Sequence, residues 1–152
     1  MSNKAHRAET FLDASFTLAP VNEEQRQTSL ELARIAAKCA AENKGQEIAV
    51  LDMTRQTSIF DCFVIATGSS RRQLHAIADD ISRAFAAEGY QRNSRSGYDE
   101  SRWIVMDYGG VIVHLFDEET REFYDLEQLW ADCPRIDLSD ALRDTGAIAA
   151  QQ

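Results

Sequence analysis

The stretch "WIVMDYGGVIVHLF", residues 103–116, decides the fold, because it predicts two strands joined by a tight turn. Gly109 and Gly110 form a two-residue connection that tolerates positive φ, and such connections close antiparallel hairpins. The connection fixes the register, so Trp103 is expected opposite Phe116. The other expected pairs are Ile104 with Leu115, Val105 with His114, Met106 with Val113, Asp107 with Ile112 and Tyr108 with Val111.

The two faces of this hairpin differ in character, because successive side chains of a strand point to opposite sides. One face is apolar apart from the phenol of Tyr108. The other face is mixed and carries Trp103, Val105, Asp107, Ile112, His114 and Phe116. The pattern alone favours burial of the mixed face as a second core layer, with a recognition surface as the alternative.

The length of 152 residues, with 44% of them hydrophobic, fits one filled core and is short for two. We therefore expect a loose N-terminal extension at 1–22, one domain at 23–136 and a C-terminal tail at 137–152. The tail is short of bulky apolar groups after Leu142, so the residues from about 137 on are expected to pack weakly and fray.

No segment approaches the roughly 18 consecutive apolar residues of a membrane span. The apolar stretch "FLDASFTLAP" at 11–20 is interrupted by Asp13, which makes it a poor signal peptide. Cys39, Cys62 and Cys133 are odd in number and far apart, so we expect reduced thiols and a cytoplasmic protein.

The formal net charge of −9 repels the phosphates of nucleic acids unless basic residues cluster. The only visible concentrations of basic residues are Arg71 with Arg72 and Arg92 with Arg95. Direct nucleic-acid recognition is therefore not expected. A basic protein partner would instead be attracted, and added salt would slow its association.

Hydrophobic periodicity predicts the remaining elements. The expected order is a helix at 23–43, strands at 47–53 and 61–67, a helix within 69–89, a weak edge strand at 90–94, the hairpin, and a short helix within 120–134. The last helix is expected to turn Phe123, Leu126, Leu129 and Trp130 inward. The fold class is therefore α/β.

The segment "TGSSRR", which follows the second strand, has two interpretations. The start of a helix after a glycine can hold a phosphate, as in nucleotidyltransferases. A capping box of Ser70 with Gln73 is favoured, because it occupies the same amides without a ligand. The paired carboxylates of a two-metal site are also missing, since Asp107 has only Val105 and Gly109 beside it on its face.

Asp107 and His114 could form half of a hydrolytic triad, but no nucleophile is evident. His6 and His75 do not have metal-ligand spacing with His114 or with a cysteine. We therefore predict no catalytic residues, no metal site and no cofactor.

Several segments together resemble the ribosomal silencing factor family, also called iojap-like proteins. The resemblance spans about Leu51 to Ala131 and is carried in order by "DCFVIATGSS", "AIAD", "W-x3-DYG", "VIVHLF" and "REFYDLEQLW". It implies a mixed sheet of about five strands flanked by helices, with nucleotidyltransferase-like topology but without the catalytic carboxylates.

The resemblance also implies a function. Members of the family bind the large ribosomal subunit through its protein fourteen, block joining of the small subunit and lower translation when nutrients are short. Members can pair as homodimers when free. The alternatives are a nucleotidyltransferase-like enzyme that uses the "TGSS" loop and a general dimeric adaptor.

The resemblance places the family's partner contacts on the hairpin of this chain. The expected partner-binding residues are Trp103, Asp107, Tyr108, Gly110, His114 and Phe116. Many members have Asp where this chain has Gly110, which puts a salt bridge at the bend in doubt. Because the family role needs an accessible face, the resemblance reverses the preference for burial, and Trp103 becomes the expected exposed anchor.

Overall fold

The structure is a computed structural model that describes residues 22–147 and 149–150. The predicted N-terminal extension lies outside these residues, apart from Asn22. The elements are α2 (Glu23–Glu42), β1 (Gln46–Asp52), β2 (Cys62–Gly68), α3 (Arg71–Ala87), β3 (Ser94–Ser96), β4 (Trp103–Asp107), β5 (Val111–Asp117), α4 (Glu118–Tyr124) and α5 (Leu126–Leu129).

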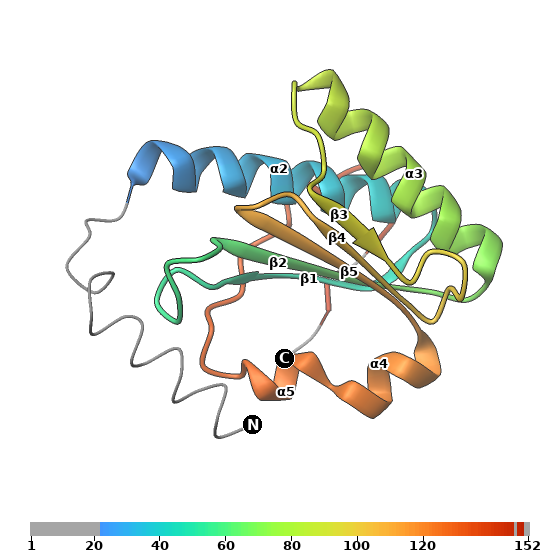
Figure 1. Cartoon of the computed structure of the whole chain (residues 1–152). Coiled ribbons are helices and arrows are strands. Elements are labelled where there is room, and N and C mark those ends of the chain that lie inside the picture. Colours follow the sequence, from blue (N-terminus) through green and yellow to red (C-terminus); the bar gives the residue numbers. More distant parts are fainter. Residues whose placement is uncertain (1–21, 148, 151–152) are drawn as a thin grey trace.

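The strands form one mixed five-stranded sheet in the order β1-β2-β5-β4-β3. Strands β2 and β5 are parallel, and every other neighbouring pair is antiparallel. Helices α2 and α3 cover one face of the sheet, and α4 and α5 lie under the other (Figure 1). The predicted α/β fold with a mixed sheet of about five strands flanked by helices is confirmed.

The hairpin has the predicted register, with Trp103 opposite Phe116 and Asp107 opposite Ile112. Gly109 has a φ of +84°. Positive φ at the first central residue but not at the second, Gly110, is the mark of a type II′ turn, whose twist matches that of the flanking strands. The backbone at this bend therefore needs glycine.

The apolar face of the hairpin packs under α2 and α3 in the larger of two core clusters. Helix α3 contributes a stripe at helical spacing that includes Leu74, Ile77, Ile81 and Phe85, all at most 1% exposed. The layer is built almost wholly from apolar side chains. It holds the sheet and the two long helices together.

The mixed face forms a second, smaller cluster with α5 and the segment after it. Its buried members are Leu51, Met53, Phe63, Ile65, Phe116 and Cys133, and half-buried side chains that include Trp103 and Trp130 pack against them. Burial, favoured by the pattern alone, holds for Phe116. Exposure, implied by the resemblance, holds in part for Trp103.

The predicted last helix is broken into α4 and α5 at Asp125, which has a φ of +46°. Buried Arg121 sets the inward side of α4. Residues two apart on a helix lie about 200° apart, so Phe123 points outward. The inward prediction was wrong for Phe123 and Leu129, which are exposed, whereas Leu126 and Trp130 pack against the second cluster.

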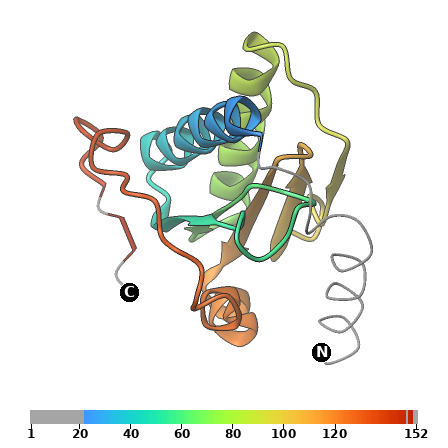
Figure 2. The same cartoon turned by 90° about the vertical axis from the view of Figure 1, so that its left-hand side faces the viewer.

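The C-terminal segment runs beside β1, in red next to the green strand in Figure 2. The N–H of Ile136 donates to the carbonyl of Val50 at 2.9 Å, which covers an edge strand. Leu138 and Leu142 are buried in the larger cluster. The expected weak packing of the tail was wrong for these two residues.

All three cysteines are free thiols, as predicted, and all three are buried. Burial raises the pKa of the Cys62 thiol to about 12. Cys62 is therefore a packing residue rather than a reactive one. None of the helices within the described ranges combines the length and apolar character that crossing a bilayer requires.

Candidate functional site

Aromatic side chains gather where β4 begins and α4 ends. The indole of Trp103 lies 4.7 Å from the ring of Tyr124 and 5.0 Å from that of Phe116, measured between centroids. Phe123 is 79% exposed and Tyr124 51%. Exposed aromatic groups of this kind, set beside one another, are typical anchors of protein interfaces.

Trp103, Phe123 and Tyr124 line a cavity of about 470 Å³, which we call the anchor cavity. Its other lining residues are Gly97, Glu100, Arg102, Asp117, Glu119 and Thr120. Three carboxylates and one guanidinium give its rim a negative charge. Asp117 also caps α4, since its Oδ1 accepts the N–H of Thr120 at 2.7 Å. Such a cavity suits a partner that offers a basic side chain, which an aromatic face also attracts.

The indole of Trp103 is held by a hydrogen bond to a buried side chain of the neighbouring strand β5. Its Nε1 donates to Nδ1 of His114 at 3.1 Å. The imidazole of His114 packs edge-on against Phe63 with centroids 4.7 Å apart. Burial lowers the pKa of His114 to about 4, so the ring is neutral at physiological pH.

The structure thus brings Trp103, His114 and Phe116 together at one end of the hairpin. Phe116 is fully buried and His114 is 7% exposed. These two side chains lie beneath the indole and support it. Trp103 is the member of the group that a partner could touch directly.

Asp107 lies on the same face of β4 as Trp103, four residues along the strand. At about 3.3 Å per residue the two residues are separated by about 13 Å. Asp107 is half-buried, and its Oδ1 accepts the N–H of Gly109 at 2.8 Å. Both lie on the same half-exposed strip of β4, within the span of one interface.

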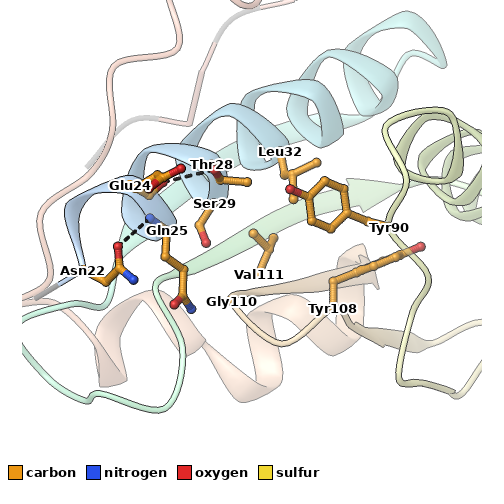
Figure 3. Close-up of a pocket in the computed structure, with 10 residues that line it drawn as sticks. All are labelled: Asn22, Glu24, Gln25, Thr28, Ser29, Leu32, Tyr90, Tyr108, Gly110 and Val111. Atoms are coloured by element: carbon orange, nitrogen blue, oxygen red, sulfur yellow. Dashed lines mark hydrogen bonds between the residues drawn. The ribbon is translucent and has the colours of Figure 1, made fainter.

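Tyr108 and Gly110 lie at the bend and line a different cavity of about 410 Å³, on the side of α2 (Figure 3). The ring of Tyr108 packs edge-on against Phe85 with centroids 4.5 Å apart. Tyr90 and Ser29 line the same cavity. The predicted residues therefore fall on both faces of the sheet rather than on one patch.

Gly110 is matched to its surroundings in this chain. A Cβ at this position would lie 2.4 Å from Oγ of Ser29 and 3.2 Å from Oδ2 of Asp61. The Ser29 hydroxyl donates to that Asp61 oxygen at 2.7 Å and occupies the space. The glycine is therefore required by the contact between α2 and the loop before β2.

The sequence reasoning missed Phe123 and Tyr124 as members of the candidate site. A signal was available in the two consecutive aromatic residues. Neighbours on a helix are 100° apart, so only one of them can point straight at the sheet.

The "TGSS" loop forms a helix cap, as favoured from the sequence. Oγ of Ser70 accepts the N–H of Gln73 at 3.1 Å, and Oε1 of Gln73 accepts the N–H of Ser69 at 2.6 Å. These two amides, which a phosphate at this helix start could otherwise use, are therefore occupied by side chains. Among the residues that the structure describes, no group of three or more His, Cys, Asp or Glu side chains is placed to hold a metal ion.

Comparison with known families gives a match to the family described as "Ribosomal silencing factor during starvation", over residues 26–152. The chain is 38% identical to the ribosomal silencing factor RsfS of Bacillus subtilis, over 69% of this chain and 89% of that protein. It is 32% identical to the RsfS of Halalkalibacterium halodurans, over 74% of this chain and 96% of that protein.

Solved structures share the fold. A crystal structure from Chromobacterium violaceum matches with a TM-score of 0.65 and 31% identity, over 68% of this chain and 86% of that one. A second, from Bacillus halodurans, matches with a TM-score of 0.62 and 32% identity, over 74% and 99% of the two chains.

Proposed function

The chain belongs to the ribosomal silencing factor family, and on that premise we propose that it binds the large ribosomal subunit and blocks joining of the small subunit. The contact is made with the subunit's basic protein fourteen. Translation is thereby lowered when nutrients are limiting. The protein acts in the cytoplasm as a binding factor, without a cofactor and without catalysis.

The anchor cavity is the observation that carries this proposal. It combines the half-buried indole of Trp103 with exposed Phe123 and Tyr124 and with the carboxylates of Glu100 and Glu119. Aromatic anchors give affinity because their contact with a partner removes a large apolar surface from water. Carboxylates on the rim select a basic partner and raise its association rate. The net charge of −9 acts in the same direction.

The proposed contact runs along the exposed side of β4 from Trp103 to Asp107 and ends at the bend. Tyr108 and Gly110 would meet the partner only at that end of the sheet, since they line the cavity beside α2. Phe116 and His114 contribute from beneath the indole. The proposed interface therefore has an aromatic centre at Trp103 and a second, acidic contact at Asp107.

Subunit joining tests the proposal. Purified chain is incubated with isolated large subunits, small subunits are added, and joined particles are measured by sedimentation. We expect the chain to travel with large subunits and to reduce joined particles in proportion to its concentration. A pull-down with purified protein fourteen tests the named partner separately.

A Trp130→Phe variant is the matched control, because Trp130 is half-buried in the second cluster and does not line the anchor cavity. This control should bind as the parent does. Normal joining at saturating concentrations of the parent chain would refute the anti-association role. Binding to large subunits without binding to protein fourteen would refute only the named contact.

A further inference from the structure

We propose that His114 is a positioning residue, which fixes the edge of the Trp103 indole that faces the partner. The inference rests on the proposed function for its biological meaning, because it takes Trp103 as the anchor. Its geometry is independent of that function. The hydrogen bond from Nε1 of Trp103 to Nδ1 of His114, at 3.1 Å, joins neighbouring strands across the hairpin.

The bond determines where His114 carries its proton. Nδ1 accepts from the indole, so the proton of the neutral ring is on Nε2. Among the described residues Nε2 has no hydrogen-bond partner, and the side chain is buried. A buried donor without an acceptor destabilises the folded state.

A phenylalanine would fill this place without that cost, since the ring packs against Phe63 and over Phe116. Packing alone therefore does not explain an imidazole here. The indole N–H does explain it, because a partly buried indole needs an acceptor and Nδ1 is the atom that supplies it. The imidazole is thus suited to orientation more than to stability.

Orientation matters because ring stacking leaves it undetermined. Phe116 stacks on the indole and Tyr124 packs against it at a tilt, and together they restrict its plane. A half-turn about the bond between Cβ and the ring would keep roughly that plane and exchange the two edges. The bond to His114 selects the orientation with Nε1 directed inward, so the remaining edge is presented to the anchor cavity.

A measurement without ribosomes tests the bond itself. The indole N–H signal of Trp103 is followed by NMR in the full chain, with Trp130→Phe used for assignment. Slow exchange with water is expected in the parent and in His114→Asn, because Oδ1 of asparagine can take the place of Nδ1. Fast exchange is expected in His114→Phe. An equally protected signal in His114→Phe would overturn the proposal.

Binding to large subunits separates positioning from packing. His114→Phe should keep or raise the melting temperature yet bind about tenfold more weakly, the loss expected when one hydrogen bond no longer orients the anchor. His114→Asn leaves a small cavity and should melt earlier, yet bind within about threefold of the parent. If affinity instead follows melting temperature, His114 is only a packing residue.

Trp103→Ala in the same assay distinguishes failure of this inference from failure of the proposed function. Loss of binding in Trp103→Ala with normal binding in His114→Phe would refute positioning and keep the anchor. Parent-like binding of Trp103→Ala would show that Trp103 is not the anchor. It would therefore also refute the positioning role of His114. Loss in both variants, with binding retained in His114→Asn, is the result we expect.

Discussion

The two faces of the sheet are closed in different ways. Under α2 and α3 the core is almost wholly apolar, and its large side chains are fully buried. Under α4 and α5 the closure depends on charged groups. Arg121 donates to Thr67 at 2.8 Å and pairs with Glu127 at 2.8 Å, and Arg135 pairs with the same carboxylate at 2.8 Å.

This difference is the reason we expect the molecule to recognise a partner with its second face. A continuous apolar layer stabilises the fold, but its side chains are buried and cannot contact a partner. The ion network holds the two short helices in place with few apolar side chains, so Phe123 and Tyr124 remain outside beside Trp103. We therefore assign stability chiefly to the first face and recognition to the second, and each prediction below tests that division.

The largest expected effect is on the first face. Phe85→Ala removes a fully buried ring and should lower the free energy of unfolding by roughly 3 to 5 kcal/mol. Denaturant unfolding measures this loss. The folded fraction should still bind large subunits with the affinity of the parent, so a parallel loss of affinity per folded molecule would contradict the division of roles.

A pH effect is expected from the second face. The pKa of His114 is about 4 in the folded chain and near 6.5 when unfolded, so only the unfolded chain takes up the proton between these values. The free energy of unfolding contributed by this residue is full above pH 6.5 and falls by roughly 3 kcal/mol as the pH is lowered to 4.

Chemical denaturation of the parent and of His114→Phe, from pH 7 to pH 4, measures this contribution as a difference. The subtraction removes the carboxylates that titrate in both proteins. The parent should lose more stability than the variant. Identical pH dependence would show that His114 is not held in its neutral form by burial.

Much of the fold was predictable from the sequence, because local rules determine it. Period-two alternation around Gly109 and Gly110 gave the register of the hairpin, and Ser70 with Gln73 gave the start of α3. The direction of Phe123 was not predictable in the same way. It depends on Arg121 reaching Thr67, a contact 54 residues away in the sequence.

The candidate site shows the same limit. The half-buried state of Trp103 depends on where α4 lies, and α4 ends at Asp125 in a left-handed conformation that no local pattern required. The burial of Phe116 and His114 likewise depends on tertiary packing. The family resemblance identified Trp103, whereas its aromatic neighbours on α4 emerged only from the structure.

Trp103→Ala should weaken recognition while leaving stability nearly unchanged. Truncation removes the anchor, so binding to large subunits should weaken by roughly 2 kcal/mol or more. The melting temperature should stay near that of the parent, because the indole is only half-buried. Co-sedimentation and thermal unfolding are measured on the same preparation. A large loss of stability with affinity retained would make Trp103 a core residue and move the docking site elsewhere.

The smallest predicted effect is that of Asp107→Lys, which tests whether recognition extends along β4 beyond the anchor cavity. Asp107 is only half-buried, so the fold should tolerate the change, at the cost of one hydrogen bond from the N–H of Gly109. Reversal of its charge opposite a basic partner should weaken binding by roughly 1 kcal/mol at low salt. Salt screens such contacts over a Debye length of about 8 Å at physiological ionic strength, so the difference from the parent should shrink as salt is added.

Glu88→Lys is the matched control for Asp107→Lys, because it makes the same charge change at the end of α3, outside both cavities. Equal weakening by the two substitutions would reduce the effect to net charge, whereas a larger, salt-sensitive loss for Asp107→Lys would place this carboxylate at the interface.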